Sequence, residues 1–158
     1  MEWLVIYCLL SCHPPTIVSD TLYGTYTIPK EKINLNLSPP NNYTVFITEY
    51  NRRSEAVSSQ EISHGHFSLV ADTIILEDAT TGKAMKLLAT NEEKLQPLNV
   101  PGLSKKAEFL GQNQYHANGK LKWEGEWRRG KKHGTWVYYD EQGDMIRSVR
   151  YRRGKKVD

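Results

Sequence analysis

Residues 115–139 read YHANGKLKWEGEWRRGKKHGTWVYY, and this stretch matches the chain that follows it at a shift of 24 residues. The pentapeptide Arg128–Lys132 recurs identically as Arg152–Lys156, in register with four other matched pairs. These pairs are Tyr115 with Tyr139, Gly119 with Gly143, Leu121 with Met145 and Trp127 with Tyr151. A short fixed period of this kind indicates an array of repeated supersecondary units.

Each unit has the pattern of a β-hairpin. Asn118-Gly119 is a strong hairpin signal because both residues tolerate a positive φ, and Gln142-Gly143 occupies the same place in the second unit. From Leu121 to Trp127 large apolar side chains alternate with charged ones, which predicts a strand with one buried face. We interpret the tryptophans as packing residues, with a ligand platform as the alternative. The expected structural positions of the repeat are Tyr115, Gly119, Trp123, Trp127, Gly130, Gly134, Trp136, Tyr139, Gly143, Tyr151 and Gly154.

The pattern Tyr-x-x-Asn-Gly-x-Leu-x-x-x-Gly-x-Trp-x-x-Gly-Lys-x-x-Gly-x-Trp-x-x-Tyr resembles the MORN repeat, in its bacterial antitoxin-like variant. Residues 115–139 match almost throughout, and 139–158 match as a second, incomplete copy in which Arg147 and Val149 replace Trp123 and Gly125. The resemblance implies a module of β-hairpins, here 113–158, that contacts another protein or a membrane surface.

Upstream, residues 22–98 are predicted to form a separate β domain. Residues 33–37 alternate strictly between apolar and polar, which is typical of a half-buried strand. Other strand-like runs cover 24–28, 43–50, 66–69, 72–76, 84–88 and 94–98, whereas 51–60 reads as a polar connection. Short strands with turns about ten residues apart predict an antiparallel sandwich or a small barrel. Residues 99–112, with Pro101-Gly102, are the expected linker to the repeats.

The order of features in 22–98 also resembles the lipocalin-like β-barrel domains of envelope lipoproteins, including the copper-stress type. That type carries a Cys-x-x-Cys pair, and this segment has no cysteine, so copper sensing is not implied here. His64-Gly65-His66 could place two imidazoles on one face of a strand, but no spacing predicts a third ligand. We therefore expect no metal site and no cofactor.

The chain begins with a short apolar run, Trp3–Leu10, that has the length of a signal-peptide core. The ending Leu9-Leu10-Ser11-Cys12 resembles the lipobox of bacterial lipoproteins. On that resemblance residues 1–11 are a signal peptide, Cys12 is lipidated, 12–21 form a tether, and the protein lies in the bacterial cell envelope. Glu2 and the lack of Lys or Arg before the run count against a signal. The alternatives are a buried first strand and a cytoplasmic protein.

The positive charge of the chain is concentrated in the repeats. The formal net charge is +3, and residues 112–158 contain twelve Lys or Arg against six Asp or Glu. Turns in successive units would lie about two strand spacings, or about 10 Å, apart along one edge. Such a row suits an acidic protein or an anionic membrane surface but not a nucleic acid, because the aromatic residues are expected to face the core. The candidate binding residues are Arg128, Arg129, Lys131, Lys132, Arg152, Arg153, Lys155 and Lys156. The alternative is that these residues only keep exposed turns soluble.

No catalytic motif is present in the sequence, so we do not expect an enzyme. The favoured hypothesis is a non-catalytic, membrane-anchored lipoprotein whose repeats mediate protein or membrane-surface interaction. Two alternatives are a soluble antitoxin-like protein that binds a toxin and a binder of small ligands in the barrel interior.

Overall fold

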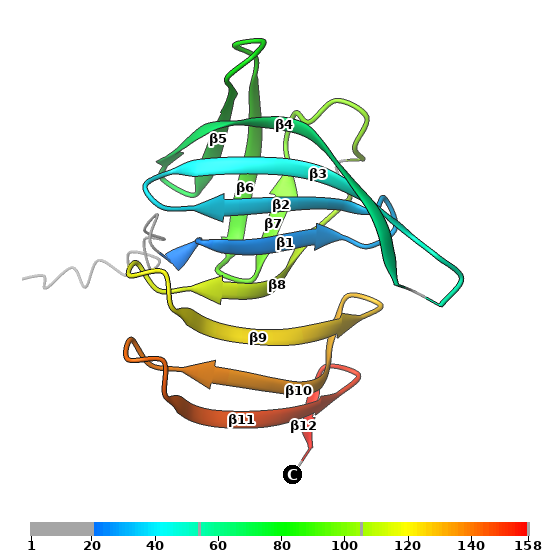
Figure 1. Cartoon of the computed structure of the whole chain (residues 1–158), viewed down its shortest axis with the longest axis vertical. Coiled ribbons are helices and arrows are strands. Elements are labelled where there is room, and N and C mark those ends of the chain that lie inside the picture. Colours follow the sequence, from blue (N-terminus) through cyan, green and yellow to red (C-terminus); the bar gives the residue numbers. More distant parts are fainter. Residues whose placement is uncertain (1–20, 54, 105, 158) are drawn as a thin grey trace, which may run out of the picture.

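The computed structural model describes residues 21–53, 55–104 and 106–157. Within these ranges it contains twelve β-strands and no α-helix, which confirms the mainly β prediction. All twelve strands form one antiparallel sheet in which each strand pairs with the next along the chain (Figure 1). None of the described segments forms a helix that could cross a bilayer. The proposed signal peptide and Cys12 lie outside the described residues.

The first eight strands close into a barrel because β1 pairs with both β2 and β8. In this pairing Gly24 lies opposite Gln114, and a Cβ on Gly24 would come within 2.2 Å of the Asn113 carbonyl oxygen. The eight strands are β1 (Gly24–Ile28), β2 (Ile33–Ser38), β3 (Asn42–Tyr50), β4 (Ala56–Val70), β5 (Thr73–Asp78), β6 (Ala84–Asn91), β7 (Lys94–Pro97) and β8 (Phe109–Tyr115). The fold is therefore a barrel and not a sandwich.

Two segments differ from their sequence interpretation. Residues 56–60, read as part of a polar connection, form the first third of the long strand β4. The closing strand β8 begins at Phe109, inside the stretch 99–112 that was expected to be a linker. In both cases pairing with another strand makes a strand of a polar or short apolar segment: residues 56–60 pair with the preceding strand β3, and β8 pairs with the distant strand β1.

The barrel core consists mainly of aliphatic and aromatic side chains that alternate along the strands. Leu35 and Leu37 of β2 are fully buried, as their spacing predicts. Asn34, expected to face outward, is also buried, because its amide group donates to Thr48 Oγ1 at 2.9 Å and accepts from Thr27 Oγ1 at 2.7 Å. Its polar atoms are thus satisfied within the sheet.

The last four strands extend the barrel sheet beyond β8 (Figure 1). They are β9 (Leu121–Arg128), β10 (Lys131–Tyr139), β11 (Met145–Arg152) and β12 (Lys155–Val157). The expected hairpins β9–β10 and β11–β12 are present, but they continue one sheet and do not stack as separate two-stranded layers. We call these four strands the extension.

The extension packs around Trp136, which is fully buried. Its ring stacks on Trp123 at 4.9 Å between centroids and meets the edge-on rings of Trp127 and Tyr151 at 5.3 Å and 6.1 Å. Gly125 makes this possible, since a Cβ there would lie 2.2 Å from the indole of Trp136. The tryptophans therefore act as a core, which leaves no open aromatic platform at this face.

Polar contacts join this aromatic core to the barrel. Buried Gln114 of β8 accepts a hydrogen bond from Trp123 Nε1 at 2.6 Å, and its amide nitrogen donates to the Tyr26 hydroxyl and to the Glu92 carbonyl. Trp127 Nε1 donates to the Gly111 carbonyl at 2.5 Å. The extension is thus fixed to the barrel by buried hydrogen bonds as well as by the shared sheet.

Candidate functional site

The two turns that contain the repeated pentapeptide lie side by side. In both turns the central residues have positive φ, at Arg129 (53°) and Gly130 (71°) and at Arg153 (55°) and Gly154 (83°). Two consecutive positive φ values are the signature of a type I′ hairpin turn. Gly154 N donates to the Lys132 carbonyl at 2.9 Å, so the second turn is hydrogen-bonded to the start of β10.

This arrangement gathers positive side chains around one cavity of about 520 Å³, which we call the basic cleft. Both turns and the outer face of β10 contribute to it. The cleft is lined by Arg128, Arg129, Lys131, His133, Arg152 and Arg153. Five of the eight predicted binding residues thus share one site, as the period of the repeat implied.

No arginine or lysine of the basic cleft forms an ion pair within the described part of the chain. The four ion pairs found there involve His64, Lys94, Lys122 and Lys132, and none uses an arginine or lysine of the cleft. Like charges gathered in one cavity repel each other and attract an anionic group. The side chains are exposed, so this field is screened by salt.

His133 is a lining residue that the sequence analysis missed. Its Nδ1 atom is buried and has no hydrogen-bond partner among the described residues. When protonated, this nitrogen is a donor that an anionic oxygen can satisfy. The alternation of side chains along a strand could have identified this residue, because His133 lies two positions from Lys131 on the same strand and therefore on the same face.

Three of the predicted binding residues do not line the basic cleft. Lys132 points to the opposite face of β10, where its ammonium lies 4.0 Å from the Trp136 ring and 2.5 Å from a carboxylate oxygen of Glu93. It therefore joins the extension to the barrel instead of facing a partner. Lys155 and Lys156 are exposed on β12 beside the cleft.

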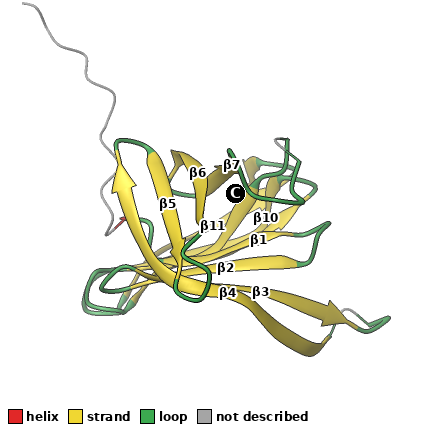
Figure 2. Cartoon of the chain, turned by 90° about the horizontal axis from the view of Figure 1, so that it is seen from above, coloured by secondary structure: helices red, strands yellow, loops and turns green. Residues whose placement is uncertain are grey.

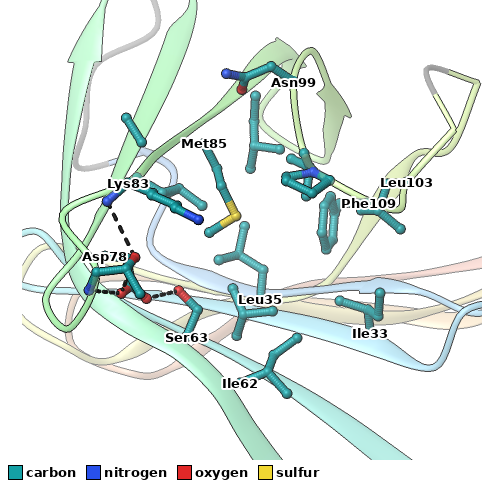
Figure 3. A pocket seen from close by; sticks show the side chains of 17 residues that line it. Ile33, Leu35, Ile62, Ser63, Asp78, Lys83, Met85, Asn99, Leu103 and Phe109 are labelled. Atoms are coloured by element: carbon teal, nitrogen blue, oxygen red, sulfur yellow. Dashed lines mark hydrogen bonds between the residues drawn. The ribbon is translucent and has the colours of Figure 1, made fainter.

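A second cavity, of about 590 Å³, lies inside one end of the barrel (Figure 3). Aliphatic side chains such as Leu35, Val45 and Leu87 form much of its wall, with Phe109 on the side of β8. Ser63, Asp78, Lys83 and Asn99 supply polar groups. The barrel centre is thus not completely filled by side chains, and we call this space the barrel cavity.

Asp78 is held as a carboxylate at the wall of the barrel cavity (Figure 3). It accepts hydrogen bonds from Ser63 Oγ at 2.7 Å, from Thr81 N at 2.7 Å and from Thr81 Oγ1 at 2.8 Å. These hydrogen bonds hold the pKa of Asp78 well below its usual range, and the bond from Ser63 has the largest effect. Burial raises the pKa of Tyr43, whose hydroxyl lies 2.9 Å from Ser63 Oγ.

His64 and His66 do not form part of a larger ligand set. His64 Nδ1 lies 2.7 Å from a carboxylate oxygen of Glu61. No group of three or more potential metal-ligating side chains occurs among residues 21–53, 55–104 and 106–157.

Comparisons of the chain with protein-family models, curated proteins and solved structures found no match. The function is therefore inferred from the geometry of the basic cleft and the barrel cavity.

Proposed function

We propose that this protein is a non-catalytic binding protein whose extension holds an anionic surface at the basic cleft. The observation that supports this proposal is the set of five arginine and lysine side chains that surround one cavity and form no ion pair in the described chain. Arginine suits this role because its planar guanidinium binds phosphate and carboxylate groups through two parallel hydrogen bonds.

The proposed surface is an anionic membrane, and an acidic protein is the competing partner. Acyl chains on Cys12, as the lipobox-like ending implies, would keep the basic cleft close to a bacterial envelope membrane. A basic patch typically adds electrostatic attraction to the membrane binding that a lipid anchor provides. The two features therefore support each other.

Vesicle binding tests the proposal. The purified chain is sedimented with vesicles of phosphatidylcholine alone or mixed with phosphatidylserine, at low and high salt. We expect binding only to the anionic vesicles and release by salt. The double variant Arg152→Gln/Arg153→Gln should reduce binding more than Lys155→Gln/Lys156→Gln, which removes the same charge outside the basic cleft. Equal losses would indicate a non-specific charge effect and contradict the proposal.

Anchoring is tested separately by intact-mass measurement of the protein from bacterial membranes. We expect a chain that begins at Cys12 and carries acyl groups. Recovery of an unmodified Cys12 from the aqueous phase alone would contradict the anchoring part of the proposal.

A second candidate function is the binding of a small apolar ligand in the barrel cavity. Its volume of about 590 Å³ and its aliphatic wall favour this function, since ligand sites are typically apolar with a few polar groups. Fluorescence of 1-anilinonaphthalene-8-sulfonate should rise on binding. Ala84→Phe, which places a phenyl ring at the wall of the cavity, should reduce the rise, whereas Ala56→Phe on an exposed strand should not. An equal response of both variants would contradict this function.

A further inference from the structure

Strand β4 has two halves with different surroundings. From Gly65 to Val70 it pairs with β3 or its turn on one side and with β5 on the other, whereas Ala56–Ser63 pair with β3 alone. The last backbone contact toward β5 is the hydrogen bond from Ala79 N to the His64 carbonyl, at 2.9 Å. Beyond it, β3 and β4 project from the barrel as a two-stranded arm (Figure 2).

The separation of the arm from β5 has a local cause. A Cβ on Gly65 would lie 2.0 Å from the Glu77 carbonyl oxygen, so the two strands approach closely there. Immediately afterwards β5 ends at Asp78, whose carboxylate binds the backbone of Thr80 and Thr81 and turns the chain away. The outer edge of β4 is therefore left uncovered from Ser63 outward.

The hydrogen-bond pattern identifies which backbone groups face this edge. Thr48 N donates to the Lys32 carbonyl, so the N–H and C=O groups of Thr48 point toward β2. Its partner on β4 is Ser59, which therefore belongs to a non-hydrogen-bonded pair and directs its own backbone groups away from β3. Glu61, opposite Phe46, shares this orientation. These outward groups have no partner in the described chain.

The side chains do not protect the edge in the usual way. Edge strands commonly carry lysine or proline, and Ala56–Ser63 contains neither. The register shifts twice along the arm, which leaves Val57 and Ile62 as the extra residues, and they are 60% and 50% exposed. Between them Ser58–Glu61 form a regular, mostly uncharged ladder.

We propose that this edge binds an extended peptide segment of a partner protein, which adds to β4 as a further strand. Unpaired N–H and C=O groups along a strand are matched by another extended backbone, and apolar side chains at the two ends of the segment would contact Val57 and Ile62. This site is separate from the basic cleft, and at Ile62 and Ser63 it adjoins the wall of the barrel cavity.

A second copy of the chain fits this edge less well. Antiparallel self-pairing about Ser59 sets Val57 opposite Glu61, an apolar side chain against a carboxylate. Pairing about Gln60 sets Ile62 opposite Ser58. Neither of these two central registers matches one apolar side chain with another, whereas a different peptide can supply apolar residues at both places.

Selection from a displayed library of random peptides tests the proposal, with the full chain as target. We expect enriched peptides that are extended and carry apolar residues at the positions opposite Val57 and Ile62. Their affinity, measured by fluorescence anisotropy, should fall about tenfold or more in Ser59→Pro, which removes one outward N–H and blocks the edge. Proline is tolerated on an edge strand when its nitrogen faces solvent, so the β3–β4 ladder should persist. Ser59→Thr, the matched control, should bind as the unchanged chain does.

Enriched peptides that bind Ser59→Pro with unchanged affinity would overturn the proposal, as would the absence of any peptide enriched over an empty surface. Hydrogen exchange provides a second measurement. The amides of Ser59 and Glu61 should exchange quickly in the free protein and slowly with peptide. Protection in the free protein that disappears on dilution would show that a second copy occupies the edge, and would also overturn the proposal.

Discussion

In the barrel, eight strands surround a mostly aliphatic core, whereas the four strands of the extension pack one face around two buried tryptophans, Trp123 and Trp136. The barrel closes on itself through β1 and β8, so each inward side chain has neighbours from several strands. The extension is open and depends on a few large rings. A single substitution at one of these rings should therefore destabilise the extension without destabilising the barrel.

Removal of the central ring should have the largest effect. Trp136→Ala should destabilise the extension by about 3–5 kcal/mol, the usual cost of deleting a buried large aromatic side chain. Hydrogen exchange should show lost protection in β9–β11 and retained protection in β2 and β5. A uniform loss across both regions would mean that the sheet unfolds as one unit, and would remove the distinction between them.

Crowding the ring should have a smaller effect on the same region. Gly125→Ala places a methyl group against the Trp136 indole, where a Cβ would lie at 2.2 Å. We expect a loss of about 1–3 kcal/mol in chemical unfolding, together with a changed tryptophan emission spectrum. Ser148→Ala, on exposed β11, is the control and should leave both unchanged. An unchanged spectrum in Gly125→Ala would contradict the close packing.

The contact between the two regions should contribute less. Lys132 and Glu93 form a partly exposed ion pair, so Glu93→Gln should cost about 1 kcal/mol or less. A double-mutant cycle with Lys132→Met measures the coupling, which should diminish at high salt. A coupling that does not respond to salt would contradict a contribution from the charge pair.

The smallest expected change concerns pH and belongs to the barrel. Because the pKa of Asp78 is lower in the folded chain than in the unfolded chain, its stabilising contribution is fully present above about pH 4. That contribution is lost as the pH falls further toward the folded-state pKa. Asp78→Asn should therefore weaken the fall of the unfolding free energy at acid pH, which is the acid limb of the pH profile. The profile above pH 5 should stay unchanged. An unaltered acid limb would contradict the role of the hydrogen bonds from Ser63 and Thr81.

The sequence predicted the elements whose pattern is local. Alternation in residues 33–37 and 121–127 indicated strands, and the two Arg-Gly turns appeared where the repeat placed them. Closure of the barrel was less predictable from the sequence, because β8 combines apolar Phe109-Leu110 with polar residues 112–114. Burial of Gln114 depends on Trp123 and Tyr26, which lie elsewhere in the chain.

The candidate sites show the same limit. The repeated pentapeptide indicated that cations would gather, but Lys132 faces the other side of β10, where Trp136 and Glu93 hold it. Strand parity could have separated Lys132 from Lys131 and identified His133. The free edge of β4 was not predictable, since it depends on where β5 ends in relation to β4.

The spacing of the two Arg-Gly turns determines how insertion of a further repeat unit would change the protein. One period spans two strands and two turns, so each duplicated unit would return its Arg-Gly turn to the same side of the sheet. Insertion of one more copy would lengthen the charged row by about 10 Å without altering the barrel. The reach of the binding surface could therefore be adjusted by whole-unit duplication, independently of any ligand that the barrel encloses.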